Sequence, residues 1–149
     1  METLIDVAAH IIISLAAAYL LWFTIGKQKK KTLVPALIVA LIFGLFIDVD
    51  HLVDYFVAYG FHISLSDFWL TNMFRINQKM FVPFHAFEYT AILAIVAYMV
   101  RNKTKKLYFA VAAVTMFLHL WTDIFLFSVP IQLYFITYRI LTNFHAAVK

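Results

Sequence analysis

The stretch Ile47-Asp48-Val49-Asp50-His51-Leu52-Val53-Asp54 decides how the rest of the chain is interpreted. It holds three carboxylates and one imidazole within seven residues, and it stands where the apolar run 33–46 would reach the end of a membrane crossing. In a helix, Asp48 and His51 would share one face because they are three residues apart. Ionisable groups at a hydrocarbon boundary are costly unless they have a use, and their oxygen and nitrogen atoms indicate a metal site.

The composition identifies an integral membrane protein. The 149 residues are 64% hydrophobic and only 13% charged, and the mean hydropathy is +0.87. A soluble domain would have about twice that share of charged residues. The length allows one helical membrane domain, 1–149, without a separate soluble domain. The chain has no cysteine, so any metal must be held by nitrogen and oxygen ligands.

The hydropathy pattern predicts an all-α bundle of four transmembrane helices followed by a shorter C-terminal helix. The expected crossings are 4–25, 33–54, 84–100 and 107–128, and the expected tail helix is 131–146. The tail is either a short fifth crossing or an amphipathic helix in the interface. The segment 60–83 mixes aromatic and charged residues, which is typical of a loop with a short interfacial helix that could cover a site.

Two basic segments predict the topology. Lys27–Lys31 and Arg101–Lys106 follow the first and third expected crossings, so they lie on the same side of the membrane. The positive-inside rule assigns that side to the cytoplasm. The net charge of +4 is therefore interpreted as a topology signal and not as a nucleic-acid binding surface.

The ionisable residues of the four expected crossings fall at one depth. His10 lies about 17 residues before the first basic segment, and Asp48 lies about as far after it. His85 and Asp123 lie about 16 and 17 residues from the second basic segment. At a rise of about 1.5 Å per residue these positions share one layer, about 20–26 Å from the cytoplasmic edge of a core of roughly 30 Å. The site is therefore expected near the extracytoplasmic surface.

This layer offers about eight candidate metal ligands. His85 and Glu88 are three residues apart, and His119 and Asp123 are four apart, so each pair can face one ion from a single helix. Eight donors exceed the roughly four that one zinc ion takes, and they suit one or two divalent metals with carboxylates that orient imidazoles. Zinc is the foremost candidate, with manganese or iron as alternatives. The candidate ligands are His10, Asp48, Asp50, His51, His85, Glu88, His119 and Asp123.

Other polar residues suggest roles in catalysis and substrate binding. Asp50 and Glu88 are candidates for the general base as well as for metal ligands. Arg75, Lys79 and Arg139 are candidates for binding a phosphate group. With water activated by a metal, these residues would suit hydrolysis of a phosphoester in a lipid whose headgroup lies at the depth of the layer.

The order of these residues resembles the small membrane-bound metal-dependent hydrolases of the YdjM type. The shared features are His10, the run Asp48-Val49-Asp50-His51, a central His85, and the run His119-Leu120-Trp121-Thr122-Asp123. Ile47 stands where that family usually has proline. The run 82–88 lacks the family's Arg-Gly and Thr-His-Ser pattern. The resemblance implies a helical bundle with a hydrolase activity. The ligand pattern is also loosely similar to the all-helical zinc phosphodiesterases of the phospholipase C and P1 nuclease type.

Three other classes of function compete with hydrolysis. A metal-binding or metal-transport protein would use the same ligands, although ligands gathered at one depth provide no polar path across the membrane. A haem protein would use histidines as axial ligands, but carboxylates beside nearly every histidine disfavour it. A purely structural role leaves the polar layer without a purpose. The sequence therefore favours a hydrolase that acts on a membrane lipid.

Overall fold

The computed structural model describes residues 2–26, 30–62, 64 and 78–146. Within these residues the fold is all-helical and contains no strand, which confirms the expected class. One isolated β-bridge joins Lys79 to His145. The helices are α1 (Glu2–Leu21), α2 (Leu33–Gly44), α3 (His51–Tyr59), α6 (Phe87–Met99), α7 (Lys103–Phe127) and α8 (Ile136–Leu141). Short π and 3-10 turns are η1 (Trp22–Gly26), η2 (Lys30–Thr32), η3 (Phe46–Asp50) and η4 (Ile131–Tyr134).

Three helical segments are long and apolar enough to cross a membrane: Ile5–Ile25, Lys30–Tyr59 and Lys103–Phe127. They correspond to the first, second and fourth expected crossings. The third, expected over 84–100, is helical only from Phe87 to Met99. Those 13 residues extend about 20 Å at about 1.5 Å per residue, which is less than a hydrocarbon core of about 30 Å.

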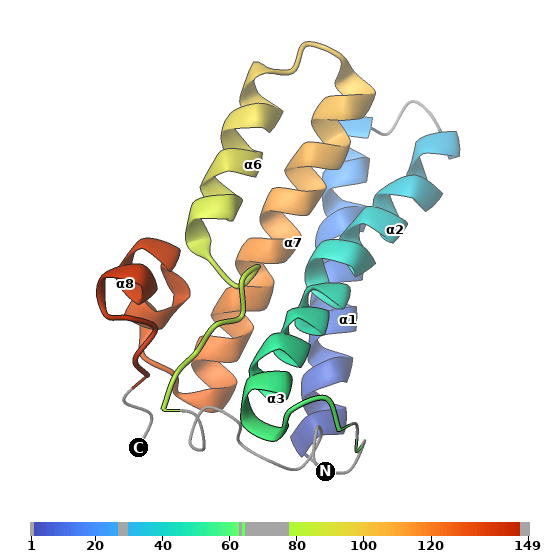
Figure 1. The fold of residues 1–149 in the computed structure, drawn as a ribbon. Helices are drawn as coiled ribbons and strands as arrows, with labels where there is room; N and C mark the ends of the chain where they lie inside the picture. Colours follow the sequence, from blue (N-terminus) through green and yellow to red (C-terminus); the bar gives the residue numbers. More distant parts are fainter. Residues whose placement is uncertain (1, 27–29, 63, 65–77, 147–149) are drawn as a thin grey trace.

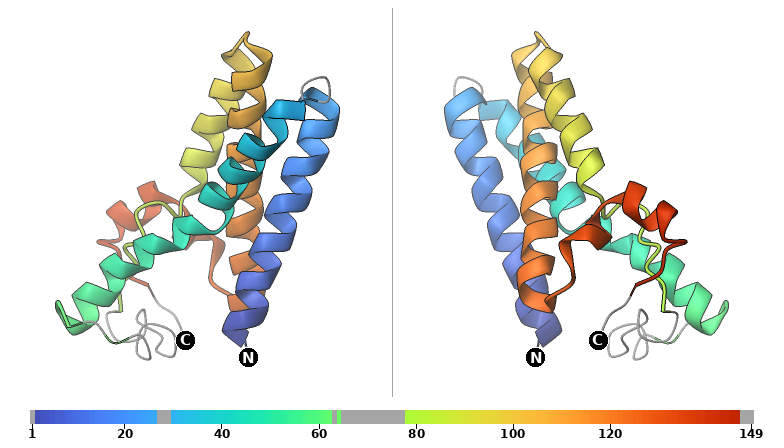
Figure 2. Two further views of the ribbon diagram at one scale, coloured as in Figure 1. Left: turned by 90° about the vertical axis from the view of Figure 1, so that its right-hand side faces the viewer. Right: turned by 90° about the vertical axis from the view of Figure 1, so that its left-hand side faces the viewer.

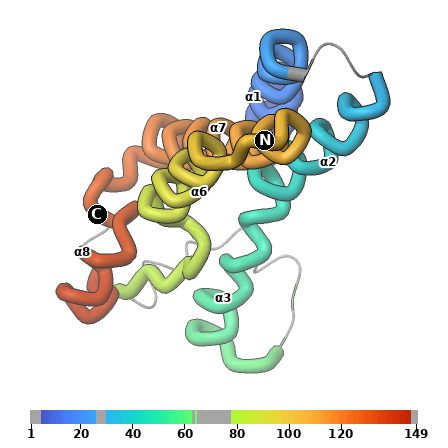
Figure 3. The backbone as a smooth tube through the Cα atoms, turned by 90° about the horizontal axis from the view of Figure 1, so that it is seen from above, coloured from blue at the N-terminus to red at the C-terminus, as the bar shows by residue number. Residues whose placement is uncertain are grey.

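Helix α7 lies at the centre of the bundle and packs against α1, α2 and α6 (Figures 1 and 3). Small residues on the buried faces allow the helix backbones to approach closely. On α2 these are Ala36, Ala40 and Gly44, spaced four residues apart, and Ala18 on α1 is fully buried against the same core. Large apolar side chains such as Ile38 and Ile92 are more than half exposed, as expected for surfaces that face lipid.

The two ends of the bundle differ in character. The turn between α6 and α7 and the start of α2 lie at one end (Figure 1), so the described basic residues Lys30, Lys31 and 101–106 share that end. The first residues of α1 and the helix α3 lie toward the other end, and α8 lies beside the bundle near the middle of its height (Figure 2). The described residues of the two basic segments therefore lie at one end of the bundle, while 27–29 of the first segment lie outside the described residues.

The C-terminal region is not the single helix expected over 131–146. It forms the 3-10 turn η4 and then α8, which has six residues and is about 9 Å long, too short to cross a membrane. The chain then turns back through positive φ angles at Asn143 and Phe144. The amide of Met80 donates to Phe144 O over 3.0 Å, and that of Ala146 donates to Gln78 O over 2.9 Å. The tail therefore packs on the segment that leads to His85.

Candidate metal centre

A break between α2 and α3 positions the acidic stretch. Gly44 packs so closely on α1 that a Cβ atom there would lie 1.9 Å from Ser14 Oγ. The next residue, Leu45, leaves helical geometry with φ −142° and ψ −53°. The amide of Asp48, which a continuous helix would pair with Gly44 O, donates instead to Leu45 O over 3.3 Å. The carbonyl of Gly44 is thereby available, and it lies 3.3 Å from His119 Nδ1.

The buried faces of α1 and α7 bring three further polar side chains to this break. On α7 the fully buried residues Leu107, Val111 and Thr115 are followed at the same spacing of four by His119, and Asp123 follows one turn later. On α1 His10 lies one turn before the buried Ser14. Each of these ligand candidates therefore continues a packed face, which fixes its direction toward the centre of the bundle.

His85 belongs to an irregular segment, 81–85, that is held by two buried charged side chains. Both oxygens of Asp54 accept hydrogen bonds, from Phe81 N and from Val82 N, each at 2.8 Å. Arg139, which is fully buried, donates to the carbonyl oxygens of Phe81, Val82 and His85. We call Asp54, Arg139 and their bonds to 81–85 the loop clamp. It holds the backbone of His85 without a regular element.

The charge of Arg139 is retained in this buried position. Burial lowers the pKa of its guanidinium, while the carboxylates of Asp50 and Asp54 oppose that shift. Because an arginine guanidinium is not deprotonated in proteins, the side chain remains a cation and keeps all of its donors. The loop clamp thus pairs one buried cation with backbone carbonyls and with two nearby acids.

Three ligand atoms from different elements form a close triangle. His85 Nε2 lies 3.0 Å from His119 Nε2, and Asp48 Oδ1 lies 3.2 Å from the former and 3.3 Å from the latter. Zinc bonds of about 2.0–2.1 Å in a tetrahedral site place ligand atoms about 3.3 Å apart. The three atoms therefore already have the spacing of ligands around one ion.

The other ring nitrogens indicate where the hydrogens are. A carbonyl oxygen can only accept, so His119 Nδ1 is the donor toward Gly44 O. His85 Nδ1 lies 2.9 Å from Asp50 Oδ1, and a carboxylate likewise favours a hydrogen on that nitrogen. In neutral rings both Nε2 atoms then present lone pairs, which meet a carboxylate oxygen of Asp48. Three electron-rich atoms at this distance repel one another unless a proton or a metal ion lies between them.

Asp123 connects this triangle to His10. Its Oδ2 lies 3.4 Å from His119 Nε2 and 3.7 Å from His85 Nε2. Its Oδ1 lies 3.1 Å from His10 Nε2, and His10 Nδ1 in turn lies 2.9 Å from the carbonyl oxygen of Asp6. One carboxylate thus faces two neighbouring groups of nitrogen ligands, as a carboxylate between two metal positions would.

His51 stands at the more open side of the group. Its Nε2 lies 3.7 Å from Asp48 Oδ1, and its ring centroid lies 4.9 Å from that of His85. The Asp48 side chain is 38% exposed and that of His51 is 24% exposed, whereas the His85, His119 and Asp123 side chains are buried. The more exposed side of the cluster is therefore the one formed by η3 and the start of α3.

We call these seven residues the His/Asp cluster: His10, Asp48, Asp50, His51, His85, His119 and Asp123. Three subsets of it have ligand atoms within 4.8 Å of one another, so the buried residues could hold a metal ion. Several buried atoms around it are paired only by close contacts between a histidine and an aspartate, such as that of His85 Nδ1 with Asp50 Oδ1 at 2.9 Å, and not by well-aligned hydrogen bonds. They are Asp6 Oδ1, His10 Nε2, Asp50 Oδ1 and His85 Nδ1.

The structure does not bring all the candidate site residues to the cluster. Glu88 turns away to α8, where its carboxylate accepts hydrogen bonds from Ile136 N and Thr137 N at 3.1 Å each. The Arg139 guanidinium is used by the loop clamp and is not exposed to a substrate phosphate. Lys79 is half-buried beside the tail. Arg75 lies outside the described residues.

Two residues of structural importance to the site were not assigned a site role from the sequence. Asp54 was part of the acidic stretch, but its partners are backbone amides 27 and 28 residues away, which no local pattern reveals. Gly44 did carry a signal, because it ends the stripe of small residues that begins at Ala36 and continues through Ala40. That periodicity marks a close helix contact, and the carbonyl bond to His119 follows from it.

Fold and site together define an all-helical protein with apolar helices able to span a membrane and a buried His/Asp cluster able to hold a metal ion. Comparison of the chain with models of protein families, with curated proteins and with solved structures gives no match.

Proposed function

We propose that this protein is a membrane-embedded, metal-dependent hydrolase that acts on a phosphoester of a lipid or lipid-linked substrate. One observation carries the proposal: Asp48, His85 and His119 present three ligand atoms 3.0–3.3 Å apart, with an accessible side next to Asp48. Catalytic zinc sites typically use three protein ligands and keep a further position open, whereas structural sites are closed by four. The resemblance to YdjM-type hydrolases, noted from the sequence, points in the same direction.

The charges around the site favour one or two divalent cations. Asp48, Asp50 and Asp123 all lie within 4 Å of a histidine nitrogen of the cluster, and uncompensated carboxylates are costly in an apolar environment. We assign the first ion to Asp48, His85 and His119, and a second position to His10 and Asp123. Zinc is the preferred ion, with manganese or iron as alternatives. A divalent metal, when bound, lowers the pKa of coordinated water toward about 7.

The remaining cluster residues either orient a metal ligand or transfer a proton. Asp50 faces His85 Nδ1, and its second oxygen accepts from Phe84 N over 2.6 Å, so it fixes the ring that supplies a ligand. His51, on the open side, is placed to exchange a proton with a substrate or with water. Glu88 has no part in this scheme because its oxygens are bonded to the start of α8.

The position of the cluster suits a lipid headgroup near a membrane surface. The described basic residues share the opposite end of the bundle, and by the positive-inside rule that end is cytoplasmic. The cluster then lies toward the extracytoplasmic side, at a depth that phosphoesters of membrane lipids reach. Lys79 remains the candidate cation for the phosphate among the described residues, because Arg139 is committed to the backbone.

The first experiment measures metal per chain in detergent-purified protein and hydrolysis of a panel of phospholipids after reconstitution with zinc, manganese or iron. Bound metal together with release of a headgroup or phosphate that a chelator stops would support the proposal. Bound metal without turnover on any lipid would favour a metal-binding or transport protein. Reproducible absence of metal after each reconstitution would refute both.

A further inference from the structure

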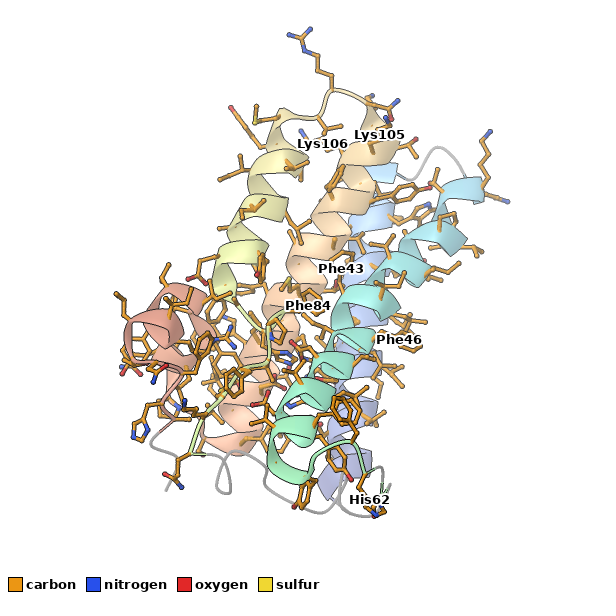
Figure 4. The ribbon with its side chains drawn as sticks, in the orientation of Figure 1. Phe43, Phe46, His62, Phe84, Lys105 and Lys106 are labelled. Atoms are coloured by element: carbon orange, nitrogen blue, oxygen red, sulfur yellow. The ribbon has the colours of Figure 1, made fainter. Side chains whose placement is uncertain are left out.

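A cavity of about 410 Å³ opens on the membrane-facing side of the bundle between α2 and α6. Val39 and Phe43 of α2 form one wall, Leu93 of α6 forms the other, and Phe109 and Ala112 of α7 form the floor. We call this cavity the acyl groove. Its lining is mostly apolar, and its polar side chains, Lys105 and Tyr108, lie toward the basic end of the bundle, where Figure 4 labels Lys105.

The acyl groove ends close to the His/Asp cluster. Phe43 immediately precedes Gly44, whose carbonyl contacts His119. Phe84, which is 58% exposed, immediately precedes His85. Along the long axis of Figure 4, Phe84 lies just below Phe43, and Lys105 lies at the far end. A chain that leaves a headgroup at the cluster would therefore enter the groove between these two phenylalanines.

The distance from the cluster to the groove matches the length of one acyl chain, which would pass the bilayer midplane because the cluster already lies below the extracytoplasmic surface. Ala112 and Phe109 precede His119 by seven and ten residues, which corresponds to about 10–15 Å along α7. Half of a hydrocarbon core of about 30 Å, the length of one leaflet's chains, is about 15 Å. A hydrocarbon chain attached to a headgroup at the cluster would thus reach the part of the groove lined by Phe109.

We infer that the acyl groove binds one fatty-acyl chain of the lipid whose phosphoester lies at the His/Asp cluster, an inference that rests on the proposed function. The chain would gain close packing against aliphatic and aromatic walls, which is the main attractive contribution available between groups already in lipid. The substrate class is accordingly a long-chain phospholipid, held at the headgroup by the metal centre and along its chain by the groove.

The test uses the full-length protein in phosphatidylcholine vesicles that contain phosphatidic acid with a photoreactive diazirine. In one preparation the diazirine is at the end of the acyl chain, and in another it is next to the glycerol. Residue-resolved mass spectrometry then locates the adducts. We expect the chain-end probe to label Leu93 and Phe109 above the lipid-facing Ile92, and the glycerol-end probe to label the region of Phe84.

Two matched pairs of variants test whether the labelling belongs to the groove. Leu93→Trp and Val39→Trp narrow it from either wall, and Ile92→Trp and Ile38→Trp place the same side chain on the neighbouring, exposed positions. Labelling of Phe109 should fall to the level of lipid-facing residues in the first pair and persist in the second. If one wall variant fails to fold, the other carries the comparison.

Other occupants give different results, and each would overturn the inference. Equal labelling of groove and lipid-facing residues would mean ordinary boundary lipid. Labelling near Lys105 by the glycerol-end probe would mean a lipid of the opposite leaflet. A groove shielded from both probes in a chain that migrates as a dimer would mean a second copy. Groove labelling without any phospholipid hydrolysis would refute the proposed function alone, whereas hydrolysis without groove labelling would refute only this inference.

Discussion

The loop clamp and the His/Asp cluster are two buried polar networks that share His85 but satisfy their polar atoms in different ways. In the clamp, Asp54 and Arg139 pair with backbone amides and carbonyls of 81–85. Donors meet acceptors within the chain, except that Arg139 Nε has no hydrogen-bond partner among the described residues. In the cluster, two histidine nitrogens and a carboxylate oxygen meet at 3.0–3.3 Å, and acceptors face acceptors. The first network is therefore largely satisfied within the chain, whereas the second is satisfied only when a proton or a metal ion lies between its acceptors.

This difference predicts two separable classes of variant. A change in the clamp should lower stability whether or not metal is present. A change in the cluster should remove binding of metal and the stability that binding adds, which grows with metal concentration because the ion binds only the folded state. Unfolding measured in detergent with and without metal distinguishes the classes.

The largest effect is expected for Arg139→Ala. The substitution removes the guanidinium donor from the carbonyl groups of Phe81, Val82 and His85 and removes the cation near Asp50 and Asp54. Removing one partner from a buried charged network typically destabilises by about 3–5 kcal/mol. Denaturant unfolding in detergent should show this loss with and without metal. A variant that loses metal binding but keeps its apo stability would show that Arg139 belongs to the cluster and not to the clamp.

His119→Ala should have the next largest effect, on metal binding. It removes one corner of the ligand triangle and the bond to Gly44 O. Loss of a residue that hydrogen-bonds to a metal ligand reduces metal affinity by about 10–100-fold. Loss of the ligand itself should therefore reduce the affinity by more than about 100-fold. Titration with zinc followed by elemental analysis measures it. The exposed His62 provides the control, since His62→Ala should keep the metal content of the parent.

Gly44→Ala should disturb both the contact between α1 and α2 and the metal site. The added Cβ would lie 1.9 Å from Ser14 Oγ, and overpacking of this kind destabilises by about 1–3 kcal/mol. Separation of α1 from α2 should also displace the carbonyl that orients His119. Because the clash involves only Ser14 Oγ and Cβ at such short range, Ser14→Gly should restore much of the stability of Gly44→Ala. Strictly additive losses in the double variant would argue against this contact as the cause.

The fold and the cluster could be predicted from the sequence to different extents. Periodicity and hydropathy identify the long helices because a membrane crossing leaves a continuous apolar run. The common depth of His10, Asp48, His85 and His119 could be read from their distances to the basic segments. The partners of Glu88 and Arg139 could not be predicted from the sequence, because they are backbone groups 48 to 58 residues away. Irregular backbone before His85 leaves no periodic signal, so α6 was expected to begin earlier.

Asp50→Asn should weaken the metal site without removing a ligand of the triangle. The side chain lies 2.9 Å from His85 Nδ1, and a carboxylate in that position makes the ring a better ligand. Its loss should reduce metal affinity by about 10–100-fold while the metal-free protein keeps most of its stability. Competition with a chromophoric chelator measures the affinity. An unchanged affinity would mean that the orientation of His85 is set by the loop clamp alone.

The smallest effect is expected for Glu88→Gln. This variant sharpens the contrast between Glu88 and Asp50, two acids that look equivalent in the sequence. Glu88 accepts hydrogen bonds at the start of α8 from Ile136 N, Thr137 N and Thr137 Oγ1. A glutamine keeps one acceptor oxygen, so the loss should stay near 1 kcal/mol, as for a helix cap. Metal content and turnover should match those of the parent, whereas Asp50→Asn lowers both. Loss of turnover in Glu88→Gln with full metal content would instead make Glu88 the proton acceptor, and would require its carboxylate to leave α8 during the reaction.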